Sequence, residues 1–75
     1  MNKSFYQFVL SFRGGGKEDE RAVFAEEMFN DLSFPKDERE YDLLSRYVEE
    51  MANEQMKPII FDELYKLYEE RVLNQ

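Results

Sequence analysis

Pro35 constrains the fold of this chain more than any other residue. Its ring disfavours helical geometry at the preceding residue, Phe34, so a helix arriving from the N-terminal side has to end there. Asp37 and Glu40 follow in the D-x-x-E pattern of a capping box, which predicts that another helix begins directly afterwards. We therefore expect Leu32–Asp37 to form the central corner of the fold, with Phe34 turned inward as an anchor.

Helical periodicity is present on both sides of this corner. Apolar residues recur at steps of three and four, the spacing of one helix face, in residues 4–12, 20–32, 38–52 and 60–73. Ser4 and Asp19 are suitable N-caps for the first two helices, because their side-chain oxygens can accept hydrogen bonds from the first turn. Helices of this length bury their apolar faces only against one another. The sequence therefore predicts one all-α domain over residues 1–75, a compact irregular four-helix bundle.

The same periodicity predicts which side chains form the core. The expected stripe of the second helix is Ala25, Met28, Phe29 and Leu32, with Val23 and Phe24 beside it. The expected stripes of the last two helices are Tyr41, Leu44, Tyr47, Val48 and Met51, and Phe61, Leu64, Tyr65, Tyr68 and Val72. Seven Phe and five Tyr supply large apolar areas, so even a chain of 75 residues can build a core.

The composition excludes several kinds of chemistry. The chain has no Cys and no His, which removes disulfides, thiolate or imidazole metal sites, and every nucleophile or base of those types. Its serines have no histidine to activate them, and its adjacent carboxylates point about 100° apart on a helix. We therefore expect no enzymatic activity, and the sequence implies no cofactor, metal or small-molecule ligand.

The run Gly14-Gly15-Gly16-Lys17 invites comparison with a phosphate-binding loop. That loop needs a glycine five residues before the Gly-Lys pair and a Ser or Thr after the lysine, but Leu10 and Glu18 occupy these positions. The run is therefore interpreted as a flexible connector between the first two helices.

The charge balance disfavours sequence-independent binding of nucleic acid. Seventeen acidic and ten basic residues give a net charge of −7, which opposes a phosphate backbone. A local basic patch remains possible if folding brings the glycine connector and the corner together; its candidate members are Arg13, Lys17, Arg21, Lys36 and Arg39. The segment after Met1 is too polar for a signal sequence or a membrane span, so we expect a cytoplasmic protein.

Several short motifs together resemble a known family. They are Ser4-Phe5-Tyr6, Arg13, Phe34-Pro35-Lys36, Leu44-Ser45 with Tyr47 and Glu49, and Phe61-Asp62-Glu63 with Tyr68. In these the chain resembles the YozE family, small uncharacterised proteins of Gram-positive bacteria, and the resemblance implies a four-helix fold like that of the sterile alpha motif (SAM). Two features differ: three glycines replace an Asn-Pro-Lys type segment after the first helix, and Tyr65 replaces a frequent Trp.

Two functional hypotheses follow. The first is a non-enzymatic protein-interaction module whose partner is an unidentified protein, without a membrane role. The second is a DNA-binding or other nucleic-acid-binding protein that uses the local basic patch.

Overall fold

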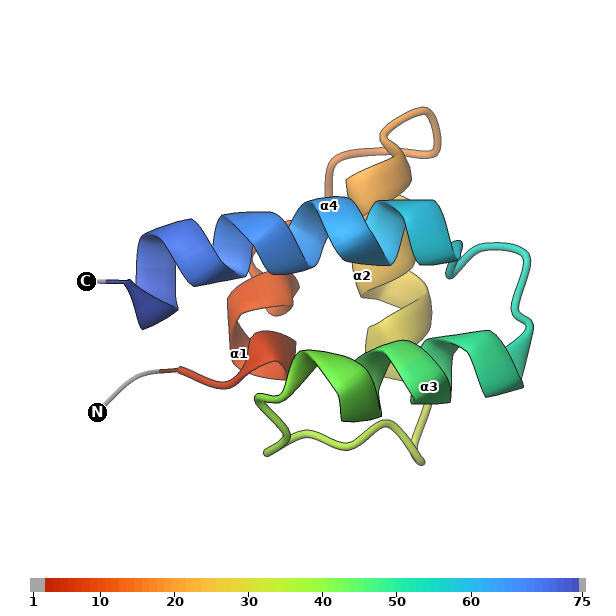
Figure 1. The fold of residues 1–75 in the computed structure, drawn as a ribbon. Coiled ribbons are helices and arrows are strands. Elements are labelled where there is room, and N and C mark those ends of the chain that lie inside the picture. Colours follow the sequence, from red (N-terminus) through yellow and green to blue (C-terminus); the bar gives the residue numbers. More distant parts are fainter. Residues whose placement is uncertain (1–2, 75) are drawn as a thin grey trace.

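The computed structural model describes residues 3–74, and these form four α-helices, the last continued by a π-helix (Figure 1). The elements are α1 (Phe5–Leu10), α2 (Glu20–Asn30), α3 (Tyr41–Met51), α4 (Pro58–Tyr68) and the π-helix η1 (Glu69–Leu73). The described residues contain no strand. The prediction of an all-α four-helix domain is thus confirmed. None of these helices is long and apolar enough to cross a membrane.

Helix α4 occupies the centre of the arrangement. It packs against α1, α2 and α3, and α1 also packs against α2. In Figure 1, α3 and α4 run antiparallel, and α2 crosses behind them. The Cα radius of gyration is 11.3 Å, close to the value of about 11 Å expected for a folded chain of this length. The bundle is therefore irregular rather than up-and-down, as the unequal helices and the Gly and Pro breaks predict.

The core is built from aromatic rings around Phe5. The ring of Phe5 lies 5.2 Å from that of Phe61 and 5.8 Å from those of Tyr65 and Tyr68, measured between centroids. Phe34 is 3% exposed and contacts this cluster from the corner, with its ring 6.5 Å from Phe5. The prediction that Phe34 is an inward anchor is confirmed.

Helix α3 begins at Tyr41, three residues later than the capping-box pattern predicts. Instead of capping a helix, the carboxylate of Glu38 accepts hydrogen bonds from the backbone N–H groups of Arg39 and Glu40, at 3.1 and 3.2 Å. The Tyr65 hydroxyl also donates to the backbone carbonyl of Arg39, at 2.7 Å. These contacts hold the segment before Tyr41 in a non-helical conformation, so the predicted Asp37/Glu40 box was wrong.

Helix α2 buries a different set of side chains from the predicted stripe. Ala25 and Met28 are buried as expected, but Phe29 is 42% exposed and Leu32 is 88% exposed. The helix ends at Asn30 and Asp31 is extended, so helical spacing no longer fixes the direction of Leu32. Because α2 is covered by both α1 and α4, Phe24 is fully buried in place of Phe29.

The predicted boundaries of the last helix also need correction. It begins at Pro58 rather than at residue 60, because proline suits the first turn, where its missing N–H has no partner to lose. From Glu69 the chain winds as a π-helix, and the N–H of Asn74 donates to the carbonyl of Glu69 at 2.8 Å. Val72 and Leu73, near the end of this wider helix, are partly buried and pack against the core.

Candidate functional site

Three adjoining hollows form one groove along α2 from Glu20 to Glu27. The largest, about 510 Å³, is lined by Gly14, Gly16, Lys17, Ala22, Val23, Glu26 and Glu27. The second, about 180 Å³, shares Lys17 and Val23 with the first and adds Glu20, Glu54, Gln55, Lys57 and Ile60. The third, about 230 Å³, shares Glu20 and Ile60 with the second and adds Glu18, Asp19, Arg21 and Glu63. We call this continuous surface the α2 groove.

The glycine connector forms one wall of the groove, and its conformation depends on its glycines. Gly14 and Gly16 have φ angles of +91° and +92°, which side chains rarely tolerate. A Cβ on Gly15 would lie 2.7 Å from a carboxylate oxygen of Asp19 and 2.9 Å from the Cβ of Ala22. The run therefore joins α1 to α2 as expected, and each of its glycines has a specific conformational or steric role.

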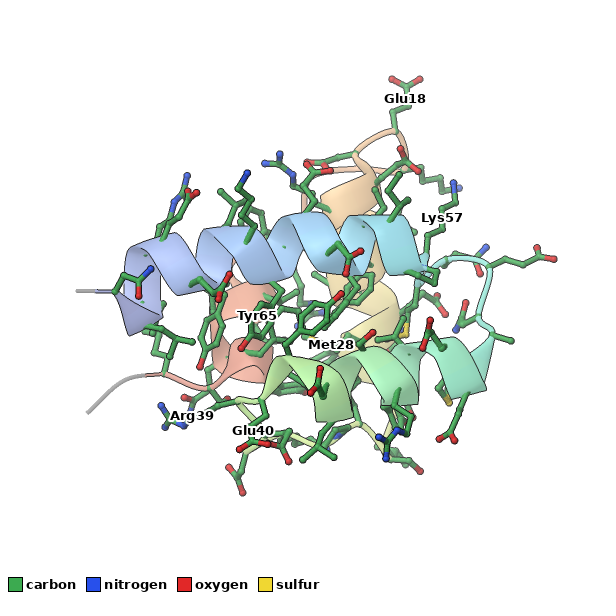
Figure 2. The ribbon with its side chains drawn as sticks, viewed as in Figure 1. Glu18, Met28, Arg39, Glu40, Lys57 and Tyr65 are labelled. Carbon is green, nitrogen blue, oxygen red and sulfur yellow. The ribbon has the colours of Figure 1, made fainter. Side chains whose placement is uncertain are left out.

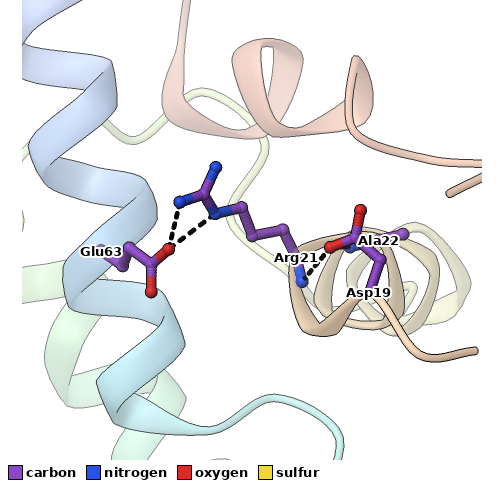
Figure 3. A network of polar contacts seen from close by, with 4 residues as sticks. All are labelled: Asp19, Arg21, Ala22 and Glu63. Atoms are coloured by element: carbon purple, nitrogen blue, oxygen red, sulfur yellow. Dashed lines mark hydrogen bonds and ion pairs between the residues drawn. The ribbon is translucent and has the colours of Figure 1, made fainter.

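The start of α2 is fixed by its cap. The carboxylate of Asp19 accepts hydrogen bonds from the backbone N–H groups of Arg21 and Ala22, at 3.0 and 3.4 Å, as predicted for this residue. Ser4 likewise caps α1, where it forms a capping box with Gln7. The side chain of Arg21 reaches across to α4 and donates from Nε to Glu63 at 2.7 Å (Figure 3). Together the cap and this ion pair position the first turn of α2 beside α4.

The groove has an apolar floor and a predominantly acidic rim. Ala22 and Ile60 are buried, and Val23 is half-buried. Among the lining residues, seven are acidic: Glu18, Asp19, Glu20, Glu26, Glu27, Glu54 and Glu63. Three are basic: Lys17, Arg21 and Lys57. The groove therefore carries a large share of the net negative charge of the protein.

Ion pairs engage several of the basic side chains near the groove. Lys57 lies 2.8 Å from the carboxylate of Glu20. Arg13 makes a two-pronged pair with Glu26, at 3.2 Å from Nε and 2.9 Å from Nη2. Its guanidinium also lies 3.7 Å from the centre of the Phe29 ring. The hydrogen bonds with Arg13 lower the pKa of Glu26, and those with Glu26 raise the pKa of Arg13, so both groups keep their charge.

The five basic residues singled out from the sequence do not form one patch. Arg13, Lys17 and Arg21 lie around the glycine connector, whereas Lys36 and Arg39 lie in the segment between α2 and α3. The 11 residues of α2, about 16 Å of helix, lie between Lys17 and Arg21 at its start and Lys36 and Arg39 beyond its end. The guanidinium of Arg13 lies against Phe29, in the last turn of α2. In Figure 2, Arg39 lies on the opposite side of the molecule from Glu18, the neighbour of Lys17 in the sequence.

Lys36 and Arg39 contact the N-terminal half of the protein. The ammonium of Lys36 lies 5.5 Å from the centre of the Tyr6 ring and donates to the carbonyl of Leu32 at 3.4 Å. The guanidinium of Arg39 donates to the carbonyl of Lys3 at 3.3 Å. The contacts with Tyr6 and Lys3 tie the corner to the start of the chain, which gives Lys36 and Arg39 a structural role.

Residues 3–74 contain no cluster of three or more acidic side chains that could hold a metal ion.

Another hollow, about 350 Å³, lies between α3 and α4, where the hydroxyl of Tyr41 donates to Asp62 at 2.6 Å. This hydrogen bond raises the pKa of Tyr41. The Tyr41 phenol therefore stays protonated at neutral pH. The hollow beside it is smaller than the largest part of the α2 groove.

Sequence reasoning missed most of the groove. Val23, Glu54 and Ile60 line it, but they come from α2, from the connector after α3 and from α4. Met56 of that connector is fully buried, although helical spacing gave no sign of it. The only local signal was the glycine run, because the remaining wall exists only after α4 has packed on α2.

Comparisons with known proteins agree with the architecture. Residues 4–70 match a family model described as the YozE SAM-like fold. A UPF0346 protein of Staphylococcus epidermidis is 44% identical over 69 residues, which cover 92% of this chain and 90% of that protein. A UPF0346 protein of Staphylococcus saprophyticus is 45% identical over 89% of this chain and 89% of that protein. A UPF0346 protein of Staphylococcus aureus is 42% identical over 92% of this chain and 92% of that protein.

Proposed function

This chain belongs to the YozE SAM-like family, and from its surface we propose that it is a non-enzymatic protein-interaction module that binds through the α2 groove. The family name and the names of the relatives state no activity, so the proposal rests on the surface of this chain. The observation that carries it is a continuous groove with an apolar floor and a charged rim. Protein interfaces commonly combine an apolar centre with a polar rim.

The composition supports the non-enzymatic part of the proposal. Without His or Cys, the chain lacks the side chains that most often act as bases and nucleophiles near neutral pH. The absence of Cys is also consistent with our expectation of a cytoplasmic protein.

Nucleic-acid binding has less support from the surface. Arg13 and Arg21 already pair with carboxylates, and Lys36 and Arg39 contact Tyr6 and the carbonyl of Lys3. A titration of labelled duplex and single-stranded DNA at low salt separates the two functions. We expect no binding, whereas micromolar binding that weakens steeply with added salt would favour the nucleic-acid function.

Site-specific photocrosslinking tests the protein-binding function. A photoreactive amino acid placed at Val23, on the floor of the groove, should give discrete protein adducts in a lysate of the organism that produces this protein. The matched control carries the same group at Leu43, an exposed apolar residue of α3. Equal adduct patterns from the two positions, or no adducts from Val23, would count against binding through the groove.

A further inference from the structure

We infer that the α2 groove receives a cationic segment of its protein partner, with an apolar side chain beside the glycine connector and Lys or Arg side chains against the acidic rim. This inference rests on the proposed function and deepens it. It assigns the chemical class of the partner, which the names of the relatives do not state.

The charge of the rim is the first argument. Among the lining residues, acidic side chains outnumber basic ones by seven to three. Two of the three basic side chains, Arg21 and Lys57, are already paired with Glu63 and Glu20. Glu18 and Glu54 make no ion pair with any residue in 3–74. The rim therefore presents carboxylates that a partner with ammonium or guanidinium groups would neutralise, and complementary charge speeds association and selects partners.

The floor is the second argument. The largest hollow is lined by Ala22, Val23 and the backbone of Gly14 and Gly16, with Lys17, Glu26 and Glu27 at its edge. A Cβ on Gly14 or Gly16 would meet no atom within 4 Å, so the space beside the connector is open. An apolar side chain placed there would be removed from water, which favours its binding. A purely polar cationic segment would leave this part of the groove unused.

Contacts within the protein already engage two of the carboxylates that line the groove, Glu26 and Glu27. Arg13 holds Glu26 through two hydrogen bonds, so Glu26 is engaged within the protein. Glu27 is half-buried and accepts a hydrogen bond from the side-chain amide of Asn53 at 3.2 Å. These contacts fix two carboxylates at the edge of the largest hollow. The exposed Glu18 and Glu54, one in each neighbouring hollow, are then the rim residues left for a ligand.

Binding of defined peptides tests the inference directly. The probes are three fluorescent peptides of equal length. The first alternates Lys and Leu, the second alternates Lys and Ser, and the third alternates Glu and Leu. We expect the Lys–Leu peptide to bind, the Lys–Ser peptide to bind about tenfold more weakly, and the Glu–Leu peptide not to bind. Binding should weaken as salt rises. In two-dimensional NMR spectra, the amide signals of Gly14, Gly16 and Val23 should shift most.

Charge-matched variants separate specific binding from general attraction to an acidic protein. The double variant Glu18→Gln/Glu54→Gln removes two carboxylates of the groove, and we expect it to bind the Lys–Leu peptide about three- to tenfold more weakly. The control Asp42→Asn/Glu50→Gln makes the same change in net charge on α3, outside the groove, and should change affinity less than about twofold. Equal effects of the two variants would overturn the inference.

The remaining outcomes distinguish this inference from the proposed function. Failure of the Lys–Leu peptide to bind at low salt, or equal binding of the Glu–Leu peptide, would overturn the inference alone if Val23 still crosslinks to proteins. Failure of both experiments would overturn the proposed function as well. A shift of amides on α3 instead of those in the groove would place the cationic ligand elsewhere and contradict the inference.

Discussion

Phe24 and Phe29 are five residues apart on α2, yet only the first belongs to the core. We expect Phe24→Ala to lower the free energy of unfolding by about 3–5 kcal/mol, because it leaves a cavity among buried aromatic and aliphatic side chains. Phe29→Ala loses a part-exposed ring and its contact with Arg13, so we expect a cost of about 1 kcal/mol. Urea denaturation followed by circular dichroism measures both changes, and equal losses would contradict this assignment of the core.

At this scale, helical spacing predicted Ala25 and Met28 correctly and Phe29 wrongly. Periodicity identifies the apolar side of a helix, but it cannot say how wide an arc its neighbours cover. For α2 that arc is set by the placement of α1 and α4, which depends on residues far away in the sequence. Phe34 was predicted correctly because a large aromatic side chain in a small domain is stabilised by burial.

The glycine connector tolerates few substitutions, because Gly14 and Gly16 have positive φ angles and Gly15 lies against Asp19 and Ala22. We expect Gly15→Ala to lower the free energy of unfolding by about 1–3 kcal/mol, the usual range for forcing an extra methyl group into a packed site. The new Cβ would collide with Asp19 and Ala22, and thus also disturb the cap of α2. Chemical denaturation measures the loss. Ser33→Ala, at an exposed loop residue, is the control and should change stability little.

Among the elements, the caps illustrate what local sequence can and cannot predict. Ser4 and Asp19 cap α1 and α2 as expected, since a cap needs only residues within one turn of itself. The Asp37/Glu40 pattern matched a capping box equally well, but no such cap forms. Hydrogen bonds from the Tyr65 hydroxyl to the Arg39 carbonyl and from the Glu40 N–H to the Glu38 carboxylate hold this backbone instead. A local pattern therefore holds where no distant side chain competes for the same backbone groups.

The whole molecule should lose stability in alkaline solution. Burial, together with the hydrogen bond and the negative charge of Asp31, raises the pKa of Tyr47 to about 12, and burial raises the pKa of Tyr65 and Tyr68. Unfolded tyrosine loses its proton near pH 10. Because the folded protein keeps these protons to a higher pH, their contribution is complete below about pH 10 and is lost as pH rises toward about 12.

Denaturation at a series of pH values, with tyrosinate absorbance recorded in parallel, checks this expectation. Tyr47→Phe removes one titrating group, so its stability should fall less than that of the unmodified protein over the same pH range. Free titration of all tyrosines near pH 10, with no loss of helical signal, would contradict the expected coupling.

At the scale of the molecule, the fold could be predicted and the groove could not. The breaks at Gly14, Pro35 and Pro58 and the helical periods determine the number of helices and their irregular packing. The groove joins residues 14–27 to residues 54–63, and no local pattern relates these segments.

The central position of α4 has a consequence for synthesis of the protein on the ribosome. The first three helices are translated before the helix on which all of them pack. Until Tyr68 has emerged, Phe5 lacks the partner rings of Phe61, Tyr65 and Tyr68. We therefore expect folding to finish only after α4 has left the ribosome. We expect shorter nascent chains to expose the inward faces of three helices, and thus to be bound by chaperones and cleaved by proteases more readily than the finished protein.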